Sequence, residues 1–528
     1  MSRIHDRLGC AVTVAVLCGS AMAQAGIASA RRDDRLTVAR QGDRVLLRSA
    51  LSATHDLVLS VGRGSNGQFN FEGAYLVAPS TPFTAERPPH ETLFHNSSDD
   101  AAPWHVNGTY IGGNHGALGV LELISAGHGL GKSDVGTSWR DGAGRPLHLV
   151  SVVSPDKLWF LGENTGAAPI WKFETACTGP TLTRPVDGAT VSFTGQVETQ
   201  LRPGIHRRED AILVDGARPL RSGETVSCAF LDLVEEYDIV NPGAILADMI
   251  AHAGEERRFT AGHLDAFVRN RIVYRFHPNG ATVVDYRAKA LQDFDLYYMG
   301  FIQSARLSFD AGRTLAYYIP KTRPFTWEGK DFDFGAIQDY TGLPPSAIYF
   351  GAAHGNVSDP DNLPDRFIQL LGDQGATAPA IGYALGYSLI RGCTRPEVRA
   401  ANAGIALMLH PHTAKSYPRA IDEKMGPRIR AGTEFHCVAY RQYFDPAAHP
   451  NATCVYWYPE GEDVVLHADY HRSVERDVLR LPAALAGKRI DVIEKTPSLV
   501  LHTGTVVPAS GLTLSVRDGY GTMVLRLQ

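Results

Sequence analysis

The strongest constraint on the fold is a recurring pattern of short apolar runs separated by turn signals. The clearest case is RIVYRFHPNGATVVDYRA (residues 271–288), in which Asn279-Gly280 lies between two runs rich in β-branched and aromatic residues. Asn-Gly readily adopts the positive φ angles of a tight hairpin turn. Asp-Gly pairs at 187–188 and 215–216 repeat the pattern. We therefore predict a chain dominated by antiparallel strands.

Helical periodicity is scarce by comparison. The two best helix candidates are the segment that starts at Pro242 and runs through AILADMIAHAGEE, and a shorter one, PDRFIQLLGD, that starts at Pro364. Each has apolar residues at spacings that would line one side of a helix. Short isolated helices of this kind do not change the expected class, which is all-β.

The length of 528 residues exceeds what one hydrophobic core usually organises. We expect a large antiparallel β-sandwich of the supersandwich type, with a β-propeller as the alternative, followed by a small C-terminal β-sandwich. The tail supports this division, since alternating apolar residues flank its Asp518-Gly519 turn. The predicted segments are a main β domain at 24–320, a loop-rich continuation of the catalytic region at 321–463 and a terminal sandwich at 464–528.

The first residues are typical of an export signal. Arg3 and Arg7 precede an apolar stretch, Cys10–Ala23, that is too short to span a bilayer. Its end, Ala-Met-Ala, fits a small-residue cleavage site. The sequence thus predicts a signal peptide at residues 1–23 and a mature protein that is secreted or periplasmic.

Composition and charge narrow the list of partners. The formal net charge is −5, and no run of basic residues suggests nucleic-acid binding. No later apolar stretch is long enough for a transmembrane helix, so we expect no membrane partner after signal removal. The favoured partner is a polysaccharide or oligosaccharide substrate.

The densest polar cluster is HETLFHNSSDDAAPWHVNGTYIGGNHG, residues 90–116. Its glycines let the backbone turn sharply and let a ligand approach closely. Its histidines are candidates for general acids and bases, above all His95 and His115. The alternative is a surface loop whose histidines are solvated.

Other residues of this cluster have binding roles in the same hypothesis. Asn114 can donate a hydrogen bond to a substrate carboxylate, and Trp104 and Tyr110 can stack on a sugar ring. The remaining candidates for substrate contact are His105, Asp99 and Asp100. Their spacing matches neither a calcium loop nor a zinc motif. We therefore expect no required cofactor, and leave open a structural divalent cation.

The Asn-Gly hairpin is the second candidate site. If Asn279 and Gly280 are its two turn residues, strand alternation puts Arg275, His277 and Tyr286 on one side of the sheet. A register shift of one residue would separate the three side chains. The alternative is a solvated sheet face without a function.

This combination suits proton abstraction beside a carboxylate. A lyase that cuts next to a uronic acid removes the weakly acidic proton at C5, and Arg or Asn stabilises the negative charge that develops. His or Tyr then transfers protons. Here the sequence resembles polysaccharide lyases that use His, Tyr and Arg, including lyases of ulvan and of rhamnose–glucuronate polymers. The resemblance implies catalytic roles for His115, His95, Tyr286 and His277, with Arg275 neutralising the substrate.

Two other functions remain open. A glycoside hydrolase needs two carboxyl groups across the scissile bond. The candidates are Glu235, Glu236 and Asp238, as well as Asp99 and Asp100. A solvated strand end is the favoured interpretation of residues 235–238. A non-catalytic carbohydrate-binding protein would need neither. The segment EFHCVAYRQYF, with His436 and Tyr440, is expected either to line the far side of a cleft or to cover a domain junction.

Overall fold

The structure is a computed structural model. It describes residues 35–63, 69–84, 92–95, 110–113, 119–124, 129–142, 144, 146–154, 157–162, 181–192, 195–200, 204–240, 265–300, 304–307, 314–318, 325–326, 366–371, 381–387, 405–409, 413–421 and 428–528. The predicted signal peptide and the helix candidate from Pro242 lie outside these residues.

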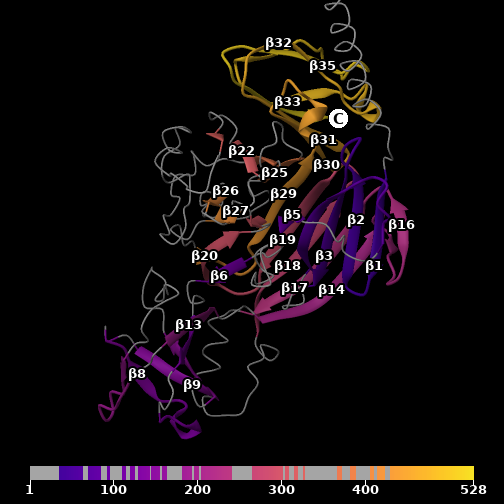
Figure 1. Cartoon of the computed structure of the whole chain (residues 1–528). Coiled ribbons are helices and arrows are strands. Elements are labelled where there is room, and N and C mark those ends of the chain that lie inside the picture. Colours follow the sequence, from indigo (N-terminus) through magenta and orange to yellow (C-terminus); the bar gives the residue numbers. More distant parts are fainter. Residues whose placement is uncertain are drawn as a thin grey trace, which may run out of the picture.

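A ten-stranded sheet forms the centre of the molecule (Figure 1). Its strand order is β15-β14-β17-β18-β19-β29-β25-β24-β22-β23, and neighbouring strands are antiparallel throughout. The outer strands are β15 (Arg218–Pro219), β25 (Ile381–Tyr387), β24 (Arg366–Leu371), β22 (Thr314–Tyr318) and β23 (Phe325–Thr326). The five strands that matter below are β14 (Gly204–Val214), β17 (Leu231–Val240), β18 (Ala266–Phe276), β19 (Ala281–Ala290) and β29 (Glu434–Phe444). The prediction of an all-β, antiparallel fold is confirmed, and a sheet this wide does not match the four-stranded blades of the propeller alternative.

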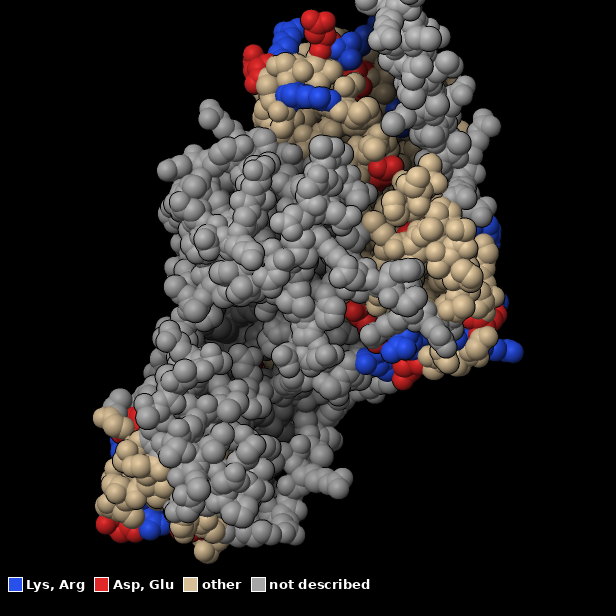
Figure 2. Space-filling model, in the orientation of Figure 1, with Lys and Arg blue, Asp and Glu red and all other residues tan. Residues whose placement is uncertain are grey.

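One face of this sheet is covered by a six-stranded N-terminal sheet, of order β16-β1-β2-β3-β4-β5. Its first four strands in this order are β16 (Thr225–Cys228), β1 (Leu36–Gln41), β2 (Arg44–Ala50) and β3 (Asp56–Arg63). Phe71 of β4 (Phe69–Val77) packs against Tyr274 and Phe276 of β18, with ring centroids 6.3 and 5.7 Å apart. The indigo strands in Figure 1 belong to this covering sheet. In Figure 2 its visible surface is mostly uncharged, and charged side chains gather along its lower edge.

Strand alternation gives the ten-stranded sheet two unlike faces. On β18, Ile272, Tyr274 and Phe276 are buried toward the N-terminal sheet, and we call this the inner face. Arg271 and Arg275 alternate with them and point the other way, to what we call the outer face. The outer face is the charged one.

The predicted hairpin exists, but its predicted register is wrong by one residue. Arg275 faces Val283, and Ile272 faces Tyr286. The turn is centred on Pro278 and Asn279, because Gly280 N donates a hydrogen bond to the carbonyl of His277. Proline fixes the φ angle that the first central position of a type I turn needs, so the turn moves back by one residue.

Gly280, with φ of +79°, then closes the turn as the residue in the left-handed region. An added Cβ would lie 2.8 Å from the carbonyl oxygen of Tyr443, so both the conformation and the space favour glycine. The shift moves Tyr286 to the inner face and leaves Arg275 on the outer face.

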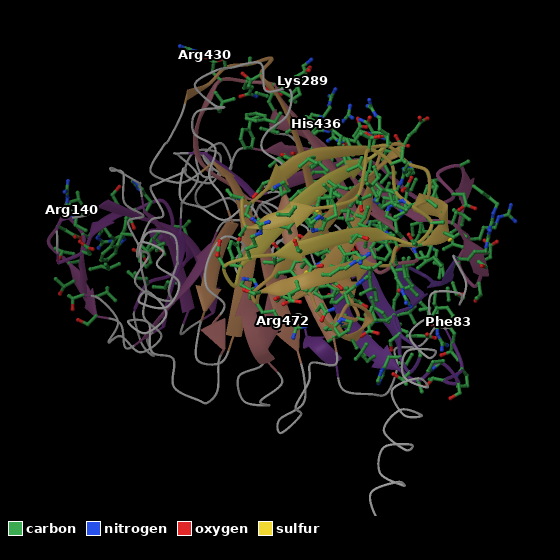
Figure 3. All side chains as sticks on the ribbon, turned by 90° about the horizontal axis from the view of Figure 1, so that it is seen from above. Phe83, Arg140, Lys289, Arg430, His436 and Arg472 are labelled. Carbon is green, nitrogen blue, oxygen red and sulfur yellow. The ribbon has the colours of Figure 1, made fainter. Side chains whose placement is uncertain are left out.

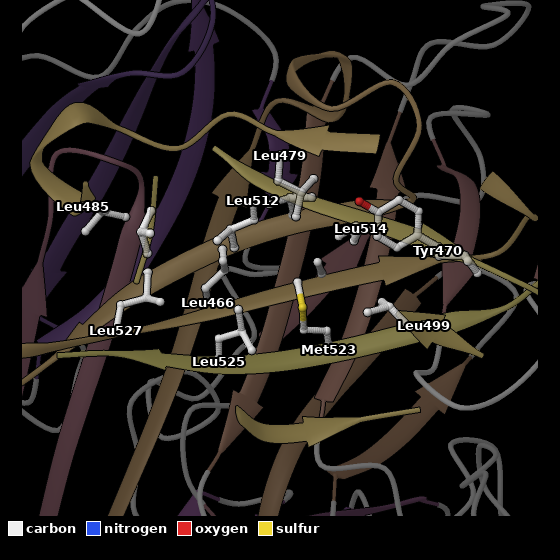
Figure 4. Close-up of a cluster of buried hydrophobic side chains, with 14 residues drawn as sticks. Leu466, Tyr470, Leu479, Leu485, Leu499, Leu512, Leu514, Met523, Leu525 and Leu527 are labelled. Carbon is white, nitrogen blue, oxygen red and sulfur yellow. The ribbon is translucent and has the colours of Figure 1, made fainter. Parts of the chain in front are cut away.

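The C-terminal sandwich consists of a four-stranded sheet, β30-β31-β36-β33, and a three-stranded sheet, β32-β35-β34. It begins at β30 (Cys454–Glu460), ahead of the predicted segment at 464–528. Leucines from both sheets, with Tyr470 and Met523, fill the space between them (Figure 4). The other strands are β31 (Asp463–Tyr470), β32 (Val474–Leu479), β33 (Ile490–Lys495), β34 (Leu499–Leu501), β35 (Leu512–Val516) and β36 (Gly521–Leu527).

Strands β30, β31 and β36 of the sandwich have side chains buried on both faces, whereas β33 is largely exposed. Along β30, Val455 and Trp457 point into the sandwich core, whereas Tyr456 and Tyr458 point to the ten-stranded sheet. There Tyr458 stacks on Tyr440 of β29, with ring centroids 4.0 Å apart. Tyr440 therefore lies at the junction between the ten-stranded sheet and the C-terminal sandwich. A domain junction was one of the two roles predicted for the segment EFHCVAYRQYF.

Two further sheets complete the described fold. A seven-stranded sheet, β12-β11-β8-β9-β10-β7-β13, has its own core around Trp139 and Phe160. Its strands are β12 (Thr190–Ser192), β11 (Thr181–Thr183), β8 (Ser138–Arg140), β9 (Pro146–Ser154), β10 (Lys157–Gly162), β7 (Gly119–Ile124) and β13 (Gly195–Gln200). A smaller sheet joins β21 (Ser304–Leu307), β27 (Thr413–Ile421), β20 (Phe294–Gly300) and β28 (Arg428–Ile429), with β6 (Tyr110–Gly113) and β26 (Ile405–Leu409) beside it. The helix predicted from Pro364 is wrong for Arg366–Leu371. This segment is strand β24, because pairing with β25 and β22 overrides its helical spacing.

In the described ranges no helix has both the length and the apolar character to cross a membrane.

Candidate active site

Charged side chains form a row across the outer face of the ten-stranded sheet. Glu236 of β17, Arg271 of β18, Arg287 of β19 and His436 of β29 face one another in register on successive strands. Residues in register share a sheet face, so the four side chains lie side by side. In Figure 3, His436 and Lys289 lie at the edge of the molecule farthest from the viewer of Figure 1.

His436 and Asp285 form a partly exposed pair within this row. His436 Nε2 lies 2.9 Å from Asp285 Oδ2, and their side chains are 29% and 33% exposed. An ionised carboxylate can only accept, so the imidazole donates to Asp285 through Nε2–H. Nδ1 is the ring nitrogen that does not face Asp285.

Asp285 is held ionised by its neighbours. Burial acts to raise the pKa of Asp285, but hydrogen bonds from Arg287 and His436 outweigh it and bring the pKa below its ordinary value. Arg287 Nε donates to Asp285 Oδ1 over 2.9 Å. One carboxylate thus orients both an imidazole and a guanidinium.

Two cross-strand pairs on this face join like charges. Arg271 faces Arg287, and Arg269 faces Lys289 two residues along the same strands. We call these four residues the cation quartet; their side chains are between 39% and 58% exposed. Like charges directly opposite each other destabilise a sheet. Each cation is, however, ion-paired with a carboxylate of this face: Arg269 with Asp238, Arg271 with Glu236, Arg287 with Asp285 and Lys289 with Glu434. The like-charge pairs are therefore compensated within the sheet.

The interpretation of residues 235–238 as a solvated strand end is wrong. β17 is an interior strand of the sheet, and Asp232, Glu235 and Asp238 are each at most 4% exposed. Asp238 accepts from Arg269 Nε over 3.0 Å. Glu235 lies on the inner face, where its Oε1 accepts from the backbone N–H of Phe69. Of the three β17 carboxylates predicted for hydrolysis, Glu235 and Asp238 are therefore inaccessible, whereas Glu236 is 31% exposed on the outer face. Hydrolysis across a substrate bond requires two accessible carboxyl groups.

The predicted hairpin residues do not form one site. Arg275 lies on the outer face in a bidentate pair with Asp232, both bonds 2.7 Å, and stacks over Phe230 at 4.2 Å. His277 lies at the turn, where burial, with a smaller contribution from Arg275, lowers its pKa to about 3. A histidine with this pKa is a poor proton acceptor at neutral pH.

Tyr286 is on the opposite face from Arg275. It is 0% exposed, and its hydroxyl donates to Asn270 Oδ1 over 2.6 Å. The register shift explains why the predicted trio is separated. A buried tyrosine with a satisfied hydroxyl has a packing role.

Replacement of Tyr286 by phenylalanine tests this correction. We expect the free energy of unfolding to fall by about 1–3 kcal/mol, because Asn270 Oδ1 loses its donor in a dry site. Activity per folded molecule should stay unchanged. Denaturant unfolding and turnover are measured on the same preparation, and a large loss of turnover without a loss of stability would return Tyr286 to the chemistry.

Most of the predicted histidine loop lies outside the described residues. This holds for Asp99, Asp100, Trp104, His105, Asn114 and His115, and their roles stay predictions. His95 ends β5 (Thr92–His95), which pairs with β4 in the N-terminal sheet. Tyr110 begins β6 (Tyr110–Gly113), which pairs with β20. Because the N-terminal sheet covers the inner face, β5 and Arg275 lie on opposite sides of the ten-stranded sheet.

Sequence reasoning gave His436 too little weight. The alternation in EFHCVAYRQYF puts His436, Val438 and Tyr440 on one face, and the structure pairs this strand with β19. The missing information was the partner strand, which supplies Asp285 and Arg287.

Among the described residues, no group of three His, Cys, Asp or Glu side chains could hold a metal ion.

Comparisons with known proteins give limited similarity. No family model and no curated protein matches the chain. Among solved structures, the chain is similar at 8% identity to an α-galactosidase from Lactobacillus brevis, with a TM-score of 0.29 over 78% of this chain and 39% of that one. An α-galactosidase of family GH36 from Geobacillus stearothermophilus gives 8% identity and a TM-score of 0.29, over 77% and 41%. A putative aldose 1-epimerase from Klebsiella pneumoniae gives 8% and 0.23, over 63% and 93%. The chain thus spans about two fifths of the length of these galactosidases.

Proposed function

We propose that this protein is a carbohydrate-active enzyme that cleaves a uronate-containing polysaccharide by β-elimination at the outer face of the ten-stranded sheet. The observation that carries the proposal is the partly exposed His436–Asp285 pair beside Arg287. It offers a proton acceptor and a charge-neutralising group on one accessible surface, the two functions that proton abstraction next to a carboxylate requires.

The chemistry follows from the positions of these groups. The guanidinium of Arg287 binds the uronate carboxylate and stabilises the charge that develops when C5 loses its proton. His436 Nδ1 takes that proton, while Asp285 stabilises the imidazolium. The electron pair of the C5–H bond forms the C4–C5 double bond as the C4–O bond breaks. The imidazolium then returns a proton to the leaving oxygen.

Contributions from the histidine loop belong to the same proposal. His115 and His95 are kept as additional acid–base candidates, with Asn114 as a donor to the carboxylate. Replacement of His115 by alanine tests this part on its own, and near-normal turnover would remove the loop from the site.

The test is incubation of the purified protein with a panel of uronate polymers and neutral glucans. We expect β-elimination to give a product with new ultraviolet absorbance, because the C4–C5 double bond is conjugated with the carboxylate. New reducing ends without absorbance would favour a glycoside hydrolase instead. Retention on the polymer with no product would favour a non-catalytic binding protein.

A further inference from the structure

We propose that two His-Pro-Asn segments form an acid-sensitive clamp, which holds the C-terminal sandwich on the ten-stranded sheet at neutral pH and releases it in acid. The first segment is residues 277–279, in the turn between β18 and β19. The second is residues 449–451, between β29 and β30. The inference concerns a conformational change of the whole protein and does not depend on the proposed chemistry.

Each segment binds the sandwich through the side chain of its asparagine. Asn279 Nδ2 donates to the carbonyl of Trp457 in β30 over 2.9 Å, and Gln442 of β29 donates to the carbonyl of Asn279 over 3.0 Å. Asn451 Nδ2 donates to Asp477 Oδ1 in β32 over 3.0 Å. The clamp therefore contacts both sheets of the sandwich, one with each asparagine.

A histidine precedes each asparagine by two residues, and both histidines are uncharged at neutral pH. Burial lowers the pKa of His277 to about 3, with a smaller contribution from Arg275. Burial also lowers the pKa of His449 to about 4, although Asp477 acts in the opposite direction. Both histidines keep part of their surface exposed, so protons from the solvent can reach them.

The surroundings of His277 do not compensate a positive charge. Its ring lies against Phe230, with centroids 6.4 Å apart, and its buried Nε2 has no hydrogen-bond partner among the described residues. Arg275 repels a charge on this ring, and Asp232 is already held in a bidentate pair with Arg275. Asp215, in the neighbouring turn, accepts from the backbone N–H groups of residues 229 and 230.

The charged groups around His449 are engaged with other partners. Asp477 accepts from Asn451 and also from the hydroxyl of Tyr470 over 2.8 Å. Arg472 donates to the carbonyls of the two residues that follow His449. A positive charge on His449 is therefore more stable in water than in the closed clamp.

Asp445 responds to acid in the opposite sense. It caps the short 3-10 helix η6 (Pro446–Ala448), and burial raises its pKa although His55 of the N-terminal sheet acts to lower it. Its protonation favours the closed form, but exposed carboxyl groups titrate at about pH 4, below the range of exposed histidines. At pH values just below 6.5, the histidines therefore set the response.

The direction of the pH dependence follows from the two protonation equilibria. In the closed form each histidine gains its proton only near its lowered pKa, whereas in the open form it does so below 6.5. The closed form is thus fully favoured above pH 6.5 and loses this advantage as the pH falls. Each histidine shifts the equilibrium toward the open form about tenfold per pH unit in this interval.

The experiment measures how fast the thiol of Cys454 reacts as the pH is lowered. Cys454 is 1% exposed in the core between the sandwich and the ten-stranded sheet, so release exposes it. The full chain is labelled with dithiodipyridine, which reacts in acid, and rates are corrected with a model thiol. We expect labelling to rise at least about a hundredfold between neutral pH and about pH 5.5. Cys228, 0% exposed elsewhere, should stay unlabelled.

Glutamine variants identify the two histidines, because glutamine is polar but takes up no proton. His277→Gln and His449→Gln are each expected to reduce the acid-induced rise about tenfold, and the double variant about a hundredfold. The matched control is His502→Gln, since His502 lies in the sandwich with Nε2 2.9 Å from Ser515 Oγ. It should behave like the parent protein, and a full rise in the double variant would overturn the inference.

A third histidine, His467 of β31, lies in the same junction. It is 4% exposed and stacks on Tyr456, with ring centroids 4.7 Å apart. Every variant retains it, so its contribution is common to all of them and cancels in the comparison.

The parent protein alone distinguishes release from ordinary acid unfolding, should a variant fold poorly. Release predicts that Cys454 reacts at a higher pH than Cys228 and that a return to neutral pH restores its protection. Reaction of both thiols at the same pH, or of neither down to about pH 5, would contradict the clamp.

Discussion

Replacement of His436 by asparagine is expected to lower turnover of a uronate polymer by about 10²–10⁴-fold, the usual contribution of a positioned acid–base group. Asparagine keeps a donor for Asp285 but has no titratable nitrogen. The fold should be unaffected, because the side chain is 29% exposed and lies on the solvent side of the sheet. The measurement is the initial rate of ultraviolet absorbance, together with the circular dichroism of the variant.

The matched control is His502, which lies in the C-terminal sandwich with its Nε2 2.9 Å from Ser515 Oγ. His502→Asn should leave the rate unchanged. If His436→Asn retains most of the activity, the outer-face site is ruled out, and the histidine loop becomes the main candidate for the chemistry.

Replacement of Arg63 by methionine is expected to have the largest effect on stability. Arg63, only 12% exposed, contacts Asp210 of β14, lies 3.2 Å from Asp43 and 3.9 Å from Glu235, and stacks over Phe69 at 4.1 Å. It thus ties the N-terminal sheet to the inner face. Its loss leaves the buried Glu235 and the partly buried Asp210 without their cation, at a cost of about 3–5 kcal/mol in the free energy of unfolding.

Denaturant unfolding checks this value, with two comparisons. Arg218→Met removes an exposed ion pair and should change the midpoint little. Adding Glu235→Gln to Arg63→Met should recover part of the loss, because one of the stranded charges is removed as well. A midpoint shift as small as that of Arg218→Met would show that the arginine does not hold the two sheets together.

Local patterns in the sequence were sufficient for the fold class but not for strand pairing. The Asn279-Gly280 signal located a hairpin correctly, and Pro278 then decided the register, since proline fits one turn position and not the next. Arg366–Leu371 has helical spacing but pairs as a strand. In both places a neighbouring residue or a distant strand outweighed the local preference.

The candidate site shows the same limit. Arg275 was correctly recognised as a charged residue on a sheet face, but its bidentate partner, Asp232, comes from β17. His436 needs Asp285, which is 151 residues away in the chain. Contacts of this kind arise from the order of strands in the sheet, which periodicity within one segment does not determine.

Strands β30, β31 and β36 of the C-terminal sandwich contribute to two hydrophobic cores, and this affects the order in which the protein folds. Tyr440 and His436 share strand β29, and Tyr440 is covered only once Tyr456, Val465 and Val524 are in place. During synthesis from the N- to the C-terminus, this part of β29 stays exposed to water until the strands of the C-terminal sandwich have been made. The packing around Tyr440 is therefore expected to form late in folding, and proteolytic loss of the tail should expose Tyr440 and loosen β29.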